Sequence, residues 1–350
     1  MKKFADLHVH MSNIEFEKCT PYLDLLESQG VTDVALQSLT YRSIIYNLMI
    51  LYWKHSYKKI NIAAFGMIHN QDRYRDIPFE TQVKALLDMG CDGIKLMNAP
   101  GSRKRIGFGL DDPRYDEMFS YLEENQIPIL IHVADPEEFW ISRELTELEK
   151  KRGWGYFDGT YLSKQELYDE TFRMLDKHPR LRVTFAHFFF LSNFIDEAVH
   201  VMESYPNVGF DITPGWEMFL GFSKNIDAWQ AFFEKYADRI YFGTDCNNTK
   251  DINPAIYQLV RTAISHDKSE FQMPCYAECM IKGLDLSKSA CNKITYKNYV
   301  KFVGTPKEVN MTAVTDAAKK IYSDIKDSND EMLARDAAWL SEFFKRTNDE

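Results

Sequence analysis

The feature that most restricts the fold is a regular alternation of short apolar segments with helical stretches. The apolar segments are rich in β-branched and aromatic residues, which is typical of strands covered on both faces in a parallel sheet. Eight strand–helix units follow one another and predict an α/β fold, the (β/α)8 TIM barrel. The predicted strands are 4–10, 33–38, 60–69, 93–97, 128–133, 182–187, 208–212 and 240–245. The predicted helices are 20–29, 44–55, 79–89, 115–125, 164–177, 195–205, 228–236 and 254–266.

No linker divides this series, so we expect residues 1–304 to form one barrel domain. Residues 305–350 contain a charged, helix-prone tail. We expect this tail to be a helical extension that packs on the barrel or lies at an oligomer contact. Nothing in its sequence suggests chemistry.

Composition excludes several classes of partner. The formal net charge of -10 argues against a nucleic-acid or anionic-membrane surface, which needs a clustered positive field. The sequence contains no run of about 20 apolar residues, so no transmembrane helix is predicted. The lysines at positions 2 and 3 are not followed by an apolar signal core, and the six cysteines lack zinc-ribbon spacing. We therefore expect a cytoplasmic protein with reduced thiols.

Two histidines stand at the end of the first predicted strand. Successive side chains of a strand point to opposite faces, so His8 and His10 project together while Leu7 and Val9 face the other way. Two imidazoles one strand repeat apart form a pair of ligands that suits zinc and its transition-metal neighbours. The alternative is two polar residues on an exposed edge strand.

Other polar residues gather at the same end of the predicted barrel, where catalytic residues of this fold lie. Five of the nine histidines are at carboxyl ends of strands: His8, His10, His69, His132 and His187. Lys95 lies late in the fourth strand and Asp245 ends the eighth. The remaining histidines fall on predicted helices. This clustering favours the metal-ligand interpretation of the first pair.

At this point the chain resembles the amidohydrolase superfamily, in particular its amidohydrolase-2 branch. The resemblance spans residues 4 to 304 and rests on six segments in family order. They are DLHVH (6–10), GIKL (93–96), IH (131–132), AH (186–187), FGTD (242–245) and KITYKNY (293–299), the last followed by Gly304.

The resemblance implies that His8, His10, His132 and Asp245 surround one divalent metal. We expect one Zn²⁺, with Mn²⁺ or Fe²⁺ as alternatives. A mixed nitrogen–oxygen ligand set with an open position can lower the pKa of a bound water towards about 7. Asp245 is then expected to take a proton as the nucleophile forms, and His187 to polarise the bond under attack. Asp6 is expected to support the ligands rather than to bind the metal.

Lys95 has two interpretations. In two-metal members of the superfamily a lysine at this place is carboxylated and bridges the metals, which would recruit His132 and His187 to the second ion. One-metal members also carry an unmodified lysine there, and an unmodified Lys95 would pair with a carboxylate or bind an anionic substrate. We favour the one-metal interpretation. His69 is expected to be a pocket wall or a hydrogen-bonding residue rather than a ligand.

Segments that follow the strands are expected to form the substrate site. Arg103 and Arg105 lie in a basic loop after strand four and predict a carboxylate-bearing substrate, against the alternative of a solvated turn. The long connection 135–162 carries Trp140 and glycines and is typical of a lid, although an ordinary surface excursion is the alternative. Trp216, after strand seven, is expected to line the pocket.

The sequence therefore predicts a metal-dependent hydrolase that uses an activated water on a C–N or C–O bond of a small carboxylated or cyclic molecule. The alternative is a non-oxidative decarboxylase, because that branch uses the same ligand set for loss of CO2. A third interpretation is a catalytically silent binding protein. The expected partner is a small-molecule substrate, and a homodimer is compatible with the resemblance.

Overall fold

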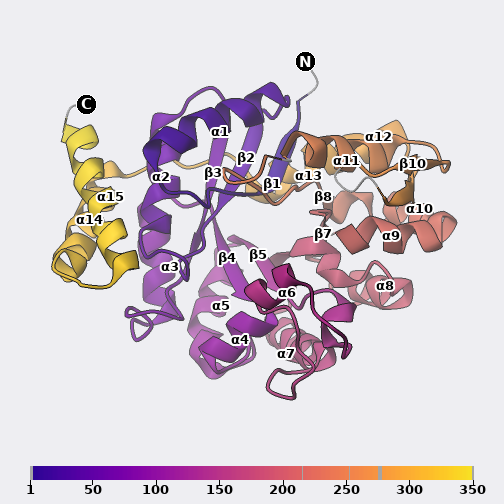
Figure 1. The fold of residues 1–350 in the computed structure, drawn as a ribbon, viewed down its shortest axis with the longest axis horizontal. Helices are drawn as coiled ribbons and strands as arrows, with labels where there is room; N and C mark the ends of the chain where they lie inside the picture. Colours follow the sequence, from indigo (N-terminus) through magenta and orange to yellow (C-terminus); the bar gives the residue numbers. More distant parts are fainter. Residues whose placement is uncertain (1–2, 215, 252, 275–277, 349–350) are drawn as a thin grey trace.

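The computed structural model describes residues 3–214, 216–251, 253–274 and 278–348, and it forms a barrel of parallel strands surrounded by helices (Figure 1). The strands are β1 Ala5–His10, β2 Asp33–Gln37, β3 Asn61–Met67, β4 Gly93–Asn98, β5 Pro128–Val133, β6 Arg182–Phe185, β7 Val208–Asp211, β8 Ile240–Tyr241 and β9 Cys246–Asn247. They are ordered β8-β7-β6-β5-β4-β3-β2-β1-β9, so from β1 to β8 each strand neighbours the next one along the chain, and β9 lies beside β1. The predicted TIM barrel is confirmed.

The eighth barrel strand is divided in two, and both parts are needed to close the barrel. β8 pairs with β7, whereas β9 pairs with β1, where Val9 lies opposite Cys246. Between them Leu7 N donates to Phe242 O at 3.0 Å, and Asp245 N donates to His8 O at 2.9 Å. Asp245 has a φ of 50°, which no regular strand adopts. The predicted single strand 240–245 is therefore interrupted over residues 242–245, the last of which, Asp245, faces the site.

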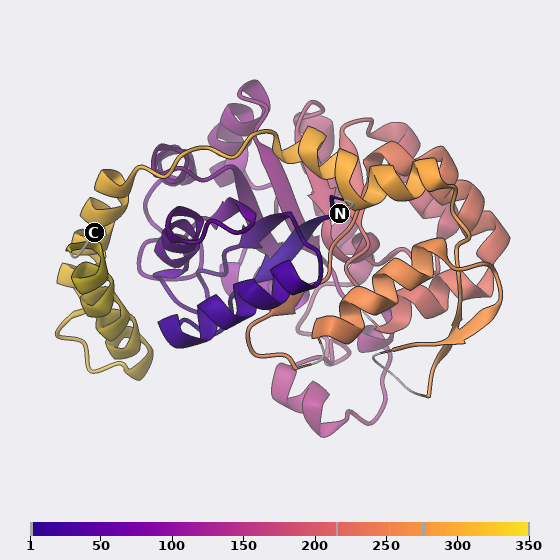
Figure 2. The same ribbon diagram turned by 90° about the horizontal axis from the view of Figure 1, so that it is seen from above.

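The helices of the strand–helix units pack around the sheet (Figures 1 and 2). They are α1 Phe16–Ser28, α2 Tyr46–Ser56, α3 Phe79–Asp88, α5 Asp116–Glu124, α7 Lys164–Lys177, α8 Ile195–Ser204, α9 Trp216–Lys224, α10 Ile226–Lys235 and α11 Asn253–Ser265. α7 has the predicted bounds because Ser163 Oγ accepts Glu166 N while Glu166 reaches back to Ser163 N, a capping box. In the described ranges, no helix has both the length and the apolar character needed to cross a bilayer.

The basic segment after β4 differs from the prediction. Residues Pro100–Ile106 form a helix, α4, rather than a loop. Pro100 occupies the first turn, where its missing N–H would have no partner, and its fixed φ suits a helix. Gly107 follows with a φ of 87° and ends the helix in a left-handed conformation that glycine adopts without strain. Because the segment is helical, the side chains of Arg103 and Arg105 point in different directions.

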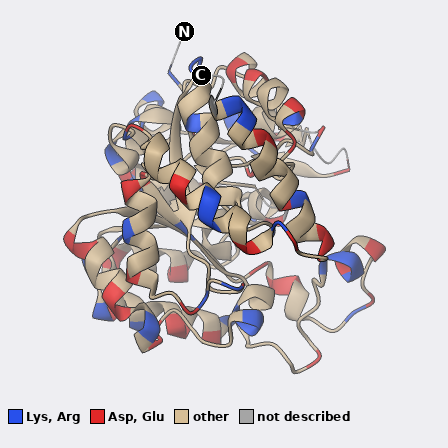
Figure 3. Cartoon of the chain, turned by 90° about the vertical axis from the view of Figure 1, so that its left-hand side faces the viewer, with Lys and Arg blue, Asp and Glu red and all other residues tan. Residues whose placement is uncertain are grey.

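Two helices follow the barrel closure, α12 Lys288–Asn292 and α13 Asn298–Val303, and the tail forms α14 Met311–Ile325 and α15 Glu331–Asn348. α14 and α15 lie at one end of the molecule beside α2 and α3 (Figures 1 and 2). The carboxylate of Asp336 accepts hydrogen bonds from Ser43 Oγ at 2.9 Å and Ile44 N at 3.1 Å. On this face, positively and negatively charged residues are interspersed along the helices (Figure 3).

Trp339 holds α15 against the first strand–helix unit, and its removal is expected to destabilise the protein. The ring is 5% exposed and stacks on Phe16 with ring centroids 5.1 Å apart. We expect Trp339→Ala to lower the free energy of unfolding by about 3 kcal/mol, because it leaves a cavity in a packed contact. Urea denaturation measures this loss. Met332→Ala, at a side chain 41% exposed on the same helix, is the control and should change it by less than about 0.5 kcal/mol. Equal effects of the two variants would contradict the prediction.

Candidate metal centre

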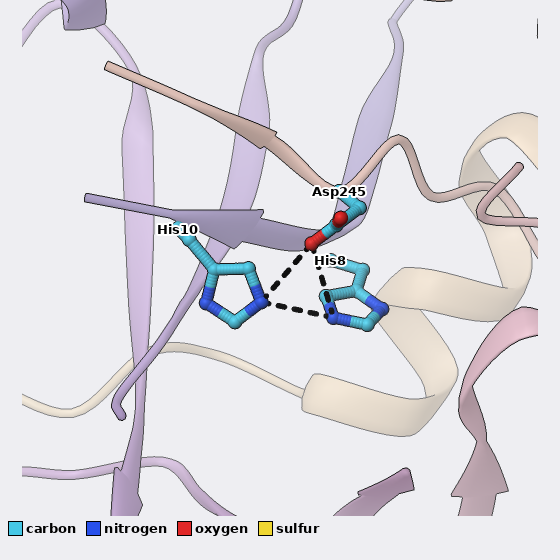
Figure 4. Close-up of side chains that lie close together, drawn as sticks. All are labelled: His8, His10 and Asp245. Atoms are coloured by element: carbon cyan, nitrogen blue, oxygen red, sulfur yellow. Dashed lines mark hydrogen bonds and ion pairs between the residues drawn. The ribbon is translucent and has the colours of Figure 1, made fainter. Parts of the chain in front are cut away.

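Three side chains from the first and eighth barrel strands meet at the carboxyl end of the barrel (Figure 4). His8 Nε2 lies 3.1 Å from His10 Nε2. Asp245 Oδ1 lies 3.3 Å from His10 Nε2 and 4.0 Å from His8 Nε2. The alternation of side chains along β1 brings the two imidazoles to one face, and the interruption at Asp245 turns its carboxylate toward them.

The hydrogen bonds of both histidines fix which nitrogen carries the proton. His8 Nδ1 lies 2.8 Å from Asp211 Oδ2, and His10 Nδ1 lies 3.1 Å from the carbonyl oxygen of Gln37. A carboxylate and a carbonyl only accept, so each Nδ1 is the donor and each Nε2 carries a lone pair. Burial lowers the pKa of His8 and His10, which keeps both rings neutral.

Three acceptor atoms therefore converge without a proton between them. Two imidazole lone pairs and a carboxylate oxygen repel one another unless a cation lies among them. Histidine and carboxylate groups are also the donors that Zn²⁺ and related ions prefer, and an acceptor on the far nitrogen is typical of metal-binding histidine. The donor set of His8, His10 and Asp245 fits a divalent metal ion.

Two further predicted residues, His132 and His187, lie in the same pocket with ring centroids 4.7 Å apart. His132 is the last but one residue of β5, but its Nε2 faces Ala134 O at 3.0 Å and Asp135 Oδ1 at 3.4 Å rather than the three converging atoms. His187 follows β6 in the turn Ala186–Phe190 instead of ending the strand. Its Nδ1 lies 3.2 Å from Thr213 O, so in the neutral ring Nε2 is an acceptor. Burial, together with His132 and His8, holds the pKa of His187 well below its usual value.

Lys95 lies at the buried end of the site, beside His8. Its side chain comes from β4, is completely buried, and places Nζ 3.5 Å from His8 Nε2. Burial lowers the pKa of Lys95 to about 8, although Asp211 and Asp245 oppose this.

The three atoms lie at the floor of a cavity of about 700 Å³ whose wall is rich in cations. Its positively charged lining residues are Arg42, Arg105, Lys151, Arg152 and Lys250. Lys250 lies 3.2 Å from Asp245 Oδ2. Burial raises the pKa of Asp245, but Lys250 and the two histidines outweigh it and hold that pKa well below its usual range. Arg42 and Lys250 were not predicted as site residues from the sequence, although both follow the ends of barrel strands.

The two arginines of α4 have different surroundings. Arg105 lines the cavity, with Nε donating to Gln71 Oε1 at 3.0 Å. Arg103 does not line it: its guanidinium binds both oxygens of Glu170 on α7, with Nη2–Oε1 at 2.7 Å and Nε–Oε2 at 2.9 Å. The helical geometry of α4 turns Arg103 toward α7, so the structure brings only Arg105 to the pocket.

The connection from β5 to α7 covers one side of the cavity. It contains Glu137–Trp140 (η2) and α6 Glu147–Arg152. Trp154 and Tyr156 line the cavity, whereas Trp140 does not line it and packs against Tyr156 with ring centroids 4.9 Å apart, and its Nε1 donates to Leu162 O at 2.9 Å. Trp216 begins α9, and its side chain lies outside the described part of the structure.

Asp6 lies beneath the centre and outside the converging group. Its oxygens accept from Tyr257 OH at 2.6 Å, Thr244 Oγ1 at 2.7 Å and His8 N at 3.0 Å. Burial raises the pKa of Asp6 to about 7. His69 lies in a different cleft, and its Nδ1 contacts Asp72 Oδ2 at 2.7 Å.

Comparison with known proteins gives a family and several similar folds. The sequence model of the family described as Amidohydrolase matches residues 59–304. Among curated proteins, none matches the sequence. An uncharacterized TIM-barrel protein from Bordetella bronchiseptica is 16% identical, with a TM-score of 0.57 over 87% of this chain and 99% of that one. The 2,6-dihydroxybenzoate decarboxylase from Rhizobium is 16% identical, with a TM-score of 0.52 over 87% and 99%. The 4-oxalomesaconate hydratase from Rhodopseudomonas palustris is 12% identical, with a TM-score of 0.51 over 92% and 99%. At these identities the structures establish a shared fold.

Proposed function

Because this chain belongs to the amidohydrolase family, we propose that it is a metal-dependent hydrolase acting on a C–N or C–O bond of a small carboxylate-bearing molecule. The observation that carries the proposal is the convergence of His8 Nε2, His10 Nε2 and Asp245 Oδ1 at the floor of a cation-lined cavity. Three acceptors without a proton fit a cation, and the surrounding positive charge fits an anionic substrate.

We assign His8, His10 and Asp245 as metal ligands, with His132 as the fourth. Because His132 Nε2 donates to Ala134 O, this role falls to its Nδ1 or requires a turn of its ring. When bound, a divalent metal such as Zn²⁺ supplies Lewis acidity and lowers the pKa of water.

We propose that two groups of the chain accept and donate protons. Asp245 offers a carboxylate whose low pKa keeps it ionised and able to accept. His187 in its neutral form presents Nε2 as an acceptor toward the site, because its Nδ1 proton is directed to Thr213 O. Asp245 and His187 are therefore the proposed acid–base residues. Lys95, held near His8 Nε2, is proposed to contact the anionic end of the substrate.

A second candidate function is non-oxidative decarboxylation. The cations of the cavity wall favour a substrate whose carboxylate is held close to the donor set, which that reaction also needs. The shared fold with the Rhizobium decarboxylase agrees with this candidate.

The test measures metal content first and products second. The protein is purified without chelator, metals per chain are determined by plasma mass spectrometry, and the loaded protein is assayed on small amides, esters, lactones and aromatic acids. Incorporation of ¹⁸O from labelled water into one product supports hydrolysis. Stoichiometric CO2 without incorporation of the label would replace hydrolysis by decarboxylation. Absence of bound metal after reconstitution with zinc, manganese or iron would contradict both.

Arg105 is expected to bind the substrate carboxylate, which gives a charge-specific prediction. Loss of a hydrogen bond between charged groups removes about 1.5–3 kcal/mol of binding, so Arg105→Gln should raise KM by about 10- to 100-fold with kcat little changed. Steady-state kinetics measures both constants. Arg103→Gln is the matched control from the same helix, and it should leave KM unchanged because Arg103 is bound by Glu170. An equal rise in KM for both variants would remove the assignment.

A further inference from the structure

The buried carboxylate of Asp211 contacts both His8 and the backbone of His187. Asp211 ends β7 and is 0% exposed. Its Oδ2 accepts from His8 Nδ1 at 2.8 Å. Its Oδ1 accepts from the backbone N–H of His187 at 2.8 Å and of Thr213 at 3.1 Å. The two oxygens thus have separate duties, one toward a proposed metal ligand and one toward the segment that carries the proposed acid–base histidine.

The segment held by Oδ1 has an unusual backbone. His187, Phe188, Phe189 and Phe190 have φ values of 56°, 54°, 54° and 52°, so four consecutive non-glycine residues lie in the left-handed region. In that region Cβ crowds the following carbonyl, and such residues persist only where surrounding contacts hold them. Phe189 stacks on Phe185 with ring centroids 4.1 Å apart, and Phe188 stacks on Phe233 at 5.4 Å. The phenylalanines fix one side of the turn in the core, and Asp211 fixes its first residue.

We propose that Asp211 is a positioning residue that couples the metal centre to His187. Its Oδ2 keeps the His8 proton on Nδ1, which leaves Nε2 free to bind a metal ion, and its Oδ1 holds the left-handed turn that aims His187 at the same cavity. The inference rests on the proposed function, since it assigns a role to Asp211 at that metal centre.

The chemistry requires a carboxylate at this position. Thr213 Oγ1 also lies 3.2 Å from His8 Nδ1, but a hydroxyl both donates and accepts and so does not fix the proton. An asparagine would keep its oxygen toward the two backbone N–H donors. Its amide NH2 would then face His8 Nδ1, which would have to accept, so the proton would move to Nε2 and the metal would lose a ligand.

Two substitutions separate the two duties. Asp211→Asn is expected to weaken Zn²⁺ binding by about 10- to 100-fold, as measured by competition with a chromophoric chelator, while the His187 amide keeps its protection from hydrogen exchange. Asp211→Ala is expected to lose both the Zn²⁺ affinity and the protection of the His187 amide. Asp92→Asn is the matched control: Asp92 is also buried, but it binds Lys54 Nζ at 2.6 Å away from the cavity. The folded fraction of Asp92→Asn should bind metal with the same affinity as the original chain.

The outcomes distinguish this inference from the proposed function. If the original chain binds no metal, the proposed function fails. If it binds metal and Asp211→Asn binds equally well, the coupling role of Asp211 is wrong and the proposed function stands. Should Asp211→Asn fail to fold, ¹⁵N NMR of the original metal-free chain decides, with the His8 signal assigned by its loss in His8→Gln. A proton on Nδ1 supports the inference, and a proton on Nε2 overturns it.

Discussion

Replacing His10 with alanine is expected to remove the bound metal and lower kcat/KM by about 10³-fold. His10 supplies one of the three converging acceptor atoms, and its Nε2 lies 3.1 Å from that of His8 and 3.3 Å from Asp245 Oδ1. Metal-ion catalysis contributes several kcal/mol, and about 4 kcal/mol corresponds to a factor of 10³. Metal content by plasma mass spectrometry and steady-state kinetics on the same preparation check both parts.

His200→Ala is the matched control for this experiment. His200 is exposed on α8 and lies outside the metal cavity, so this variant should keep the metal and full activity. Treatment of the original chain with a chelator should reproduce the loss seen in His10→Ala, and added zinc should reverse it only where His10 is present. Retention of stoichiometric metal by His10→Ala would show that the converging atoms are not the binding site.

Replacing Asp6 with asparagine is expected to change how stability depends on pH, by an amount that reaches about 4 kcal/mol. The pKa of Asp6 is raised from 3.8 to about 7 in the folded protein, chiefly by burial. Between these two values the folded state binds more protons than the unfolded state, so the contribution of Asp6 is fully present below pH 4 and is lost as pH rises through about 7. A difference of about three pKa units corresponds to about 4 kcal/mol.

The measurement is the free energy of unfolding by urea from pH 4 to pH 8 in both proteins. An asparagine does not titrate, so Asp6→Asn should become steadily more stable relative to the original chain as pH rises across this window. Asp24→Asn is the control that should show almost no pH dependence in this window, because the hydrogen bond from Lys59 lowers the pKa of Asp24 from 3.8 and its carboxyl is ionised in both states above pH 4. A pH-independent difference for Asp6→Asn would contradict the prediction.

Much of the fold follows from local sequence alone. Apolar strands and amphipathic helices have different periods, and the order of the units restricts how parallel strands can be connected. The same reasoning places His8, His10 and Asp245 at one end of the barrel, because a barrel collects the carboxyl ends of its strands there. The predicted helix 164–177 matches α7, and the capping box between Ser163 and Glu166 accounts for where this helix begins.

The tertiary structure decided everything that depends on the direction of single side chains. Sequence treats Arg103 and Arg105 alike, but the turn of α4 sends one to Glu170 and the other to the cavity. Asp211 lies 203 residues from His8, and no local sequence pattern predicts the hydrogen bond between them. Such contacts arise only when the barrel closes and the loops take their final φ and ψ angles. Periodicity therefore determined the layers of this protein, whereas closure of the barrel determined which atoms meet in its site.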